Sequence, residues 1–131
     1  MQLLLLYLAG GVAGSLAHCG YAYHRAREAG YGRFGRSAWA LAGPPALGAS
    51  AACNAIMVVD IALFPTRTIL LYGLLPMPAA LLGVLWLLRD VSGAMEGAGS
   101  VAHAGHLGGA AVGVAFWALI RRGRIRPRGW Y

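Results

Sequence analysis

An apolar run begins at Gly48-Ala-Ser-Ala-Ala-Cys-Asn54 and continues to Phe64. The dipeptide Pro44-Pro45 precedes it, and because proline fixes φ and lacks an N–H group, the pattern predicts a helix that begins near Ala46. This helix would carry a serine, Ser50, close to its N-terminus. The N–H groups of a helix's first turn have no partner inside the helix, so an oxygen bound there can accept them and be stabilised by the helix dipole.

The composition indicates a membrane protein. The chain has 131 residues, a mean hydropathy of +0.61 and only 11% charged residues, which excludes an ordinary soluble domain and predicts a polytopic membrane domain. The net charge of +7 arises from arginine, and five arginines fall in the basic tail, residues 121–131. Beside an apolar span, such a tail is typical of a topology signal or a lipid contact. The sequence therefore predicts a lipid bilayer, and no nucleic acid, as partner.

Four apolar segments predict an all-α bundle of about four transmembrane helices in a single domain. They comprise residues 2–18, 46–64, 69–88 and 101–120. The first segment contains Gly10, Gly11 and Gly14, small residues that allow another helix to approach closely. The third contains Pro76-Met-Pro78, which predicts a kinked helix.

The connecting segments carry most of the charge. Residues 20–38 mix arginines with aromatic side chains, which predicts a loop at the membrane interface. Residues 89–100 are small and glycine-rich and predict a second loop, which includes Asp90. Asp60 lies near the end of the second span, and we expect it to pair with Arg67 across the following turn.

Two histidines, His103 and His106, lie near the start of the last span. His106, Gly109 and Gly113 share one face of the predicted helix, and the glycines let a neighbouring helix come close. Histidines three residues apart can bind a metal, but a closed site needs three or four ligands and no third ligand is evident. The sequence therefore predicts no metal and no cofactor.

Ser50 and His106 match in depth. The second and fourth spans cross the membrane in the same direction, because exactly one span, the third, lies between them and returns the chain to the first side. Ser50 is four residues into one span and His106 is five residues into the other. At 1.5 Å per residue, both lie roughly 6–8 Å below the same membrane face. This match favours a catalytic pair of nucleophile and base over two unrelated polar residues.

Two motifs around these residues resemble those of the rhomboid family of intramembrane serine proteases. The family's G-x-S-G reads Gly48-Ala-Ser-Ala51 here, and its A-H-x-x-G-x-x-x-G reads Gly105-His-Leu-Gly-Gly-Ala-Ala-Val-Gly113. The runs Asn54–Pro65, Pro76–Ala79 and His106–Ala110 are similar to the mitochondrial, presenilin-associated rhomboid-like type of plants and algae. The resemblance covers essentially the whole chain.

The resemblance implies a serine-type endopeptidase that cleaves transmembrane protein substrates with a Ser–His dyad. Ser50 would be the nucleophile and His106 the general base. The Ser50 backbone would hold the oxyanion, with the Ala51 backbone as a second donor. Helix packing at the site would use three glycines, Gly48, Gly109 and Gly113. The resemblance also implies a multi-pass protein of the mitochondrial inner membrane.

The chain departs from the family pattern in three ways. A rhomboid core has six spans, so four spans predict the C-terminal part of that core, truncated at the N-terminus. Asn54 is the only asparagine and lies on the serine helix, so the family's oxyanion-binding histidine and asparagine are not expected here. Ala51 replaces a glycine, and its methyl group can push the two catalytic helices apart.

Two other functions stay open. One is an inactive rhomboid-like protein, or fragment, that binds transmembrane clients without cutting them. Ala51 and the short chain favour it, whereas intact Ser50 and His106 oppose it. The other is a piece of a transporter or channel, with Asp60, His103 and His106 as a polar path.

Overall fold

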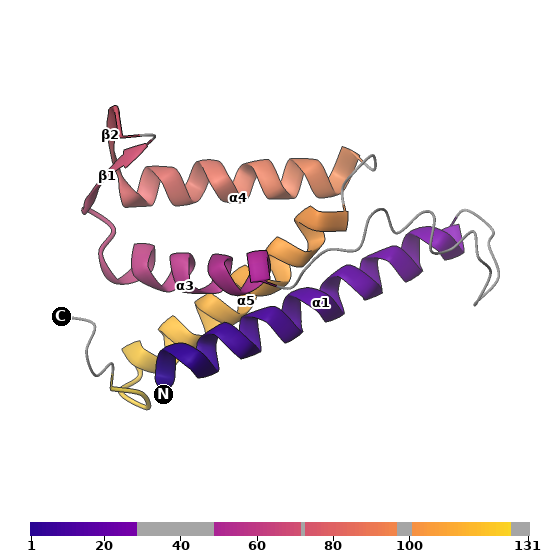
Figure 1. The fold of residues 1–131 in the computed structure, drawn as a ribbon, viewed down its shortest axis with the longest axis horizontal. Coiled ribbons are helices and arrows are strands. Elements are labelled where there is room, and N and C mark those ends of the chain that lie inside the picture. The colour runs from indigo at the N-terminus through magenta and orange to yellow at the C-terminus, as the bar shows by residue number, and fades with distance from the viewer. Residues whose placement is uncertain (29–48, 72, 97–100, 127–131) are drawn as a thin grey trace.

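A computed structural model of the protein describes residues 1–28, 49–71, 73–96 and 101–126. Within these ranges the chain forms four helices and one hairpin (Figure 1). The elements, in chain order, are α1 (Gln2–Glu28), α3 (Ala49–Leu63), β1 (Thr68–Leu71), β2 (Leu75–Pro78), α4 (Ala79–Glu96) and α5 (Val101–Arg121).

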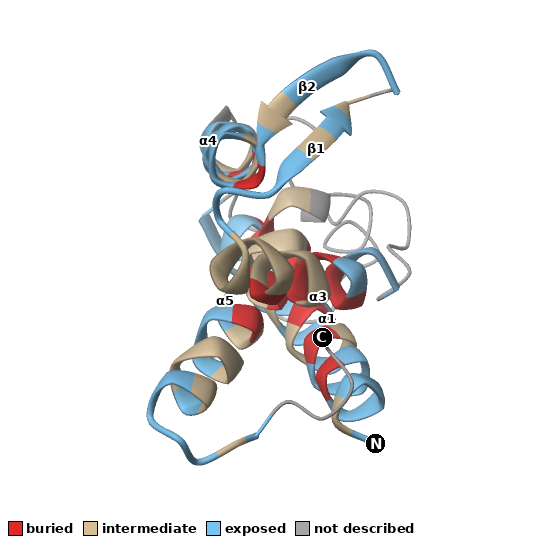
Figure 2. Cartoon of the chain, turned by 90° about the vertical axis from the view of Figure 1, so that its left-hand side faces the viewer, coloured by how far each residue is buried: buried red, intermediate tan, exposed pale blue. Residues whose placement is uncertain are grey.

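Helices α1, α3 and α5 pack against one another and make up what we call the three-helix unit. Helices α3 and α5 run in the same direction and α1 runs in the opposite one, as the sequence predicts for the second and fourth spans (Figure 1). Helix α4 and the hairpin lie on the far side of α3 from α1 (Figures 1 and 2). The fold is thus the three-helix unit with one further helix laid on it.

Small residues bring these helices together, as the glycines of the first span predict. A Cβ placed on Gly10 would lie 2.7 Å from the Cβ of Ala55 and 3.2 Å from the Cα of Ala52. A Cβ on Gly108 would lie 2.8 Å from the backbone oxygen of Ala13. Real Cβ atoms do not approach so closely, so α1 contacts α3 and α5 nearly backbone to backbone.

An apolar core lies where the three helices meet. Leu6, Ala55 and Val59 are at most 1% exposed, and larger side chains of α3 and α5 pack around them. Figure 2 shows the buried residues gathered at this junction, with exposed residues on the outward faces. Those outward faces carry leucine and valine on α1 and α4. Exposed apolar faces of this extent are typical of helices that contact lipid.

Two described helices, α1 and residues His103–Arg121 of α5, are long and apolar enough to cross a membrane. Helix α3 is apolar but shorter. The predicted spans at 46–64 and 101–120 are confirmed as helices, Ala49–Leu63 and Val101–Arg121. Residues 46–48 of the first of these lie outside the described residues.

The predicted loop at residues 20–38 is wrong for its first part, because α1 continues to Glu28. The extension is helical because it has packing partners. Ala22 and Ala26 are buried, and the Tyr21 hydroxyl donates a hydrogen bond to the backbone oxygen of Ala94 on α4 at 2.5 Å. The arginines and tyrosines of this stretch mark one helix end, whereas the sequence interpretation took them for a loop. Residues 29–38 lie outside the described residues.

The predicted kinked helix at residues 69–88 is also wrong. Strands β1 and β2 pair as an antiparallel hairpin in which Leu70 faces Pro76, and Gly73 between them adopts a φ of 72°. Pro76 and Pro78 lack the N–H groups that a helix would need, so the helix starts only after Pro78. Helix α4 then continues to Glu96, so most of the loop predicted at residues 89–100 is helical instead. Residues 97–100 are outside the described ranges.

Candidate active site

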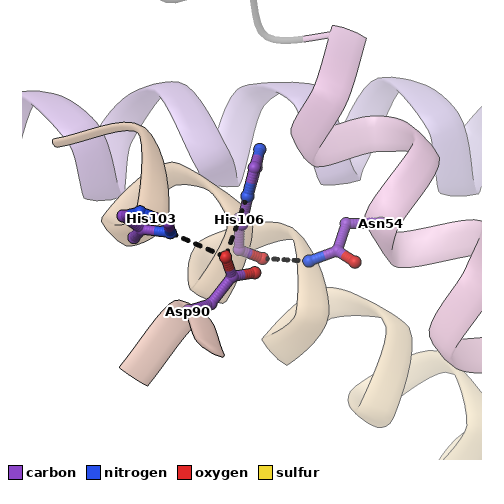
Figure 3. A network of polar contacts seen from close by, with 4 residues as sticks. All are labelled: Asn54, Asp90, His103 and His106. Atoms are coloured by element: carbon purple, nitrogen blue, oxygen red, sulfur yellow. Dashed lines mark hydrogen bonds and ion pairs between the residues drawn. The ribbon is translucent and has the colours of Figure 1, made fainter. Parts of the chain in front are cut away.

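Ser50 lies in the first turn of α3 and is exposed. One turn further along, the Asn54 side-chain nitrogen donates a hydrogen bond to the backbone oxygen of His106 at 2.8 Å (Figure 3). Asn54 is 8% exposed, so this contact joins α3 and α5 inside the protein. The two helices that carry Ser50 and His106 therefore touch one helical turn from the serine.

Gly109 sits against the backbone of Ala51, the residue after the serine. A Cβ on Gly109 would meet the Ala51 backbone oxygen and lie 3.0 Å from the Ala51 Cα. Gly113 repeats this one turn later, where a Cβ would lie 2.6 Å from the backbone oxygen of Ala55. The predicted close approach at both glycines is present. Gly48 lies outside the described residues.

The methyl group of Ala51 does not separate the two helices. It is 2% exposed and points toward Gly14 of α1, where an added Cβ would collide with it. Gly109 approaches the same residue from its backbone side. The expected obstacle is therefore absent, because α1 supplies the space that the methyl group needs.

Asp90 is the polar residue that sequence reasoning missed. It projects from α4, is 1% exposed, and places its Oδ1 2.8 Å from His103 Nδ1 and 3.2 Å from His106 Nδ1 (Figure 3). We call Asp90, His103 and His106 the Asp–His–His cluster. Taking Pro78 as a helix N-terminal boundary would have put Asp90 on a helix rather than in a loop.

The Asp90 contact determines which nitrogen of His106 can act as a base. A carboxylate only accepts hydrogen bonds, so the hydrogen of a neutral His106 ring belongs on Nδ1, facing Asp90. The lone pair is then on Nε2, and the ring extends away from Asp90 (Figure 3). The side chain of His106 is 20% exposed. This is the tautomer that a general base for a serine requires.

The other predicted polar residue of the second span, Asp60, is placed elsewhere. Its carboxylate lies 3.5 Å from the Arg67 guanidinium near the opposite end of α3, which confirms the expected ion pair. Both side chains are partly exposed. Asp60 thus takes part in the turn toward the hairpin, away from the Asp–His–His cluster.

Comparison with known proteins relates this chain to one family. Over 126 residues, it is 43% identical to "RHOMBOID-like protein 12, mitochondrial" of Arabidopsis thaliana. The match covers 95% of this chain and 37% of the relative, so the chain spans well under half of that protein's length. No solved structure matches it significantly. The sequence-family model described as "Rhomboid domain" matches residues 1–123, and the chain therefore belongs to the rhomboid family of helical membrane proteins.

Proposed function

We propose that the protein is an intramembrane serine endopeptidase in which Ser50 is the nucleophile and His106 the general base. Helices α1, α3, α4 and α5 are its membrane helices, forming one partial rhomboid domain. The single observation that carries the proposal is the 3.2 Å contact between Asp90 and His106 Nδ1, which favours a base with its lone pair on Nε2. The junction of α3 and α5 one turn from Ser50 supports the same pairing.

The reaction would begin when His106 Nε2 accepts the Ser50 hydroxyl proton while Oγ attacks a peptide carbonyl carbon. The tetrahedral oxyanion would form at the start of α3, where the first-turn N–H groups, including those of Ser50 and Ala51, point out of the helix end. His106 would then give its proton to the leaving amine, and water would hydrolyse the acyl-enzyme by the same steps. Asp90 would act as a positioning residue that holds the ring and stabilises the imidazolium.

The substrates would be proteins with a transmembrane segment whose backbone opens locally near the membrane surface. The relative from Arabidopsis is described as mitochondrial, and we extend that location to this chain, with the inner membrane as its site. The lipid bilayer is its second partner. Its oligomeric state does not enter the mechanism.

A fluorophosphonate probe tests the proposal, because it labels only serines activated by a base. The purified chain in nanodiscs should be labelled, and Ser50→Ala and His106→Ala should abolish labelling. Ser15→Ala is the matched serine control, since the Ser15 hydroxyl donates to the Gly11 backbone oxygen at 2.9 Å on another helix. His24→Ala is the histidine control, because His24 pairs with Glu28 on the exposed end of α1. Labelling that survives Ser50→Ala would refute the proposal.

Client binding without cleavage is the second candidate function. The matched segment is 37% of the relative, so both functions are also tested within the full length of that protein. A chimera separates the two functions. In it, this chain replaces the matching segment of the Arabidopsis protein. Labelling of the chimera at Ser50 supports the protease, whereas a folded chimera that is never labelled but crosslinks to a transmembrane peptide supports client binding.

A further inference from the structure

The Asp–His–His cluster has the composition of a metal site. One ligand atom from each of Asp90, His103 and His106 lies within 4.8 Å of the other two. The two histidines alone offer too few ligands for a metal, and α4 supplies a third ligand as a buried carboxylate, which the sequence does not predict. We propose that these three side chains bind Zn²⁺ and that the ion inactivates the site. The inactivation, though not the binding, rests on the proposed protease function.

The ligand set matches zinc chemistry. Two imidazole nitrogens and one carboxylate oxygen, with an open fourth position, are typical of zinc sites that retain a water molecule. Both histidine side chains are about one-fifth exposed, at 21% and 20%, so an ion and its water can enter from solvent. Magnesium prefers oxygen ligands and octahedral geometry, so this cluster selects against it.

The geometry needs only a small adjustment to hold the ion. Asp90 Oδ1 is 2.8 Å and 3.2 Å from the two Nδ1 atoms. Bonds of about 2.0–2.2 Å in a tetrahedral site separate the ligand atoms by about 3.4 Å, so the Asp90 oxygen would move about 0.6 Å away from His103 Nδ1 and about 0.2 Å away from His106 Nδ1. The rings of His103 and His106 stand nearly perpendicular, at 89°, with centroids 6.2 Å apart. Gly93 leaves the space that His103 occupies, since an added Cβ there would collide with the ring.

The same nitrogen that contacts Asp90 would bind the metal, and this is why binding would inactivate the site. Without the ion, Nδ1 of His106 carries the hydrogen and Nε2 carries the lone pair. When Nδ1 donates its lone pair to zinc, a neutral imidazole must carry its hydrogen on Nε2. Nε2 can then no longer accept the proton of Ser50. Binding of one ion would therefore shift the hydrogen of His106 from Nδ1 to Nε2, and this shift needs no movement of the helices.

Binding is tested first with Co²⁺, which reports tetrahedral coordination by its visible absorption and is displaced by Zn²⁺. The chain in nanodiscs should develop this absorption at about one equivalent, and Ser50→Ala should do so equally, because it removes no ligand. His103→Ala and Asp90→Asn should each weaken binding by more than about 100-fold, which exceeds the roughly 10–100-fold loss that removal of an outer partner causes. His24→Ala is the matched control. Absence of the absorption, or its persistence in His103→Ala, would overturn the proposal.

Inactivation is tested by probe labelling with and without Zn²⁺, each variant being compared with itself. Zinc should reduce labelling of the chain at least about tenfold, since a base contributes roughly 10²–10⁴ in rate. A chelator should restore labelling, and Mg²⁺ should leave it unchanged. In His103→Ala the ratio with and without zinc should approach one. Equal zinc sensitivity in that variant would contradict the inferred site.

The two assays distinguish failure of this inference from failure of the protease proposal. Cobalt binding that depends on His103 and Asp90, in a chain that the probe never labels, would establish the metal site and refute the protease. Labelling that depends on Ser50 and His106, in a chain that gives no cobalt absorption, would do the reverse.

Discussion

The three-helix unit and α4 are held in place by different forces. In the three-helix unit, Gly14, Gly109 and Gly113 let backbones meet, and the core contains small side chains and few polar ones. Helix α4 contacts α3 near its start, where Gly83 lies against Ile61. Near its end it contacts the three-helix unit through Asp90, through Gly93 against His103, and through the Tyr21 hydroxyl. Many of its apolar side chains are exposed, and Val84 and Leu88 are more than half exposed. The three-helix unit is thus held by close backbone contact, whereas polar contacts, above all those of Asp90, contribute to the docking of α4.

This difference connects the fold to the site. The tight contact of α3 and α5 fixes the backbone around Ser50 and His106, where small errors in position are costly for catalysis. The looser α4 supplies the group that sets the tautomer of His106. A change in the three-helix unit should therefore cost stability everywhere, whereas a change at Asp90 should release α4 and alter the histidines.

Gly109→Ala should have the largest effect. The added Cβ would meet the backbone of Ala51, which cannot rotate away, so we expect the free energy of unfolding to fall by about 3 kcal/mol or more. Thermal unfolding in detergent measures it. Gly20→Ala is the matched control, since nothing lies within 4 Å of a Cβ there, and it should be neutral or stabilising by up to about 1 kcal/mol. Equal behaviour of the two variants would refute the close contact.

Asp90→Ala comes next. It removes the shared acceptor of two histidines, and we expect a loss of about 2–3 kcal/mol in the free energy of unfolding. Hydrogen exchange should become faster in α4 before it changes in the three-helix unit. Asp60→Ala is the control, because its exposed pair with Arg67 is worth less than about 1 kcal/mol. Faster exchange spread evenly over all the helices would contradict this division of the molecule.

Ala51→Gly restores the residue usual in the family, yet it should destabilise this chain. It removes a buried methyl group that faces Gly14, and the expected cost is about 1–2 kcal/mol from lost burial and lower helix propensity. Ala80→Gly, at an exposed position in the first turn of α4, controls for propensity alone. If the two substitutions cost the same, the methyl group contributes nothing to packing.

Asn54→Ala should have the smallest of these effects. It removes the hydrogen bond to the backbone oxygen of His106, and we expect a loss of about 1 kcal/mol. Gln2→Ala is the matched control, because its side-chain amide donates to the Arg126 backbone oxygen in an exposed setting at 2.9 Å. Chemical denaturation of the two variants measures the difference, and a larger loss in Gln2→Ala would show that burial does not strengthen this contact.

Helix periodicity and small-residue spacing sufficed to predict α3, α5 and the glycines at their contact. These signals are local, because each helix carries its own pattern. The hairpin is not predicted because its residues are as apolar as those of a membrane helix. Pro76 and Pro78 also fit two interpretations, a kink within a helix and the boundary before one. The first interpretation places Asp90 in a loop. Its contact with His103 and His106 joins separate helices, so only tertiary packing reveals it.

The central claim is that Ser50 is an activated serine, and locating the probe adduct by mass spectrometry tests it most directly. The chain has five serines, at positions 15, 37, 50, 92 and 100. After labelling in nanodiscs and digestion, we expect a phosphonyl adduct on the peptide that contains Ser50 and no such adduct in His106→Ala. An adduct on another serine of this chain would contradict the claim. So would the absence of any adduct in the folded full-length chimera after removal of metal.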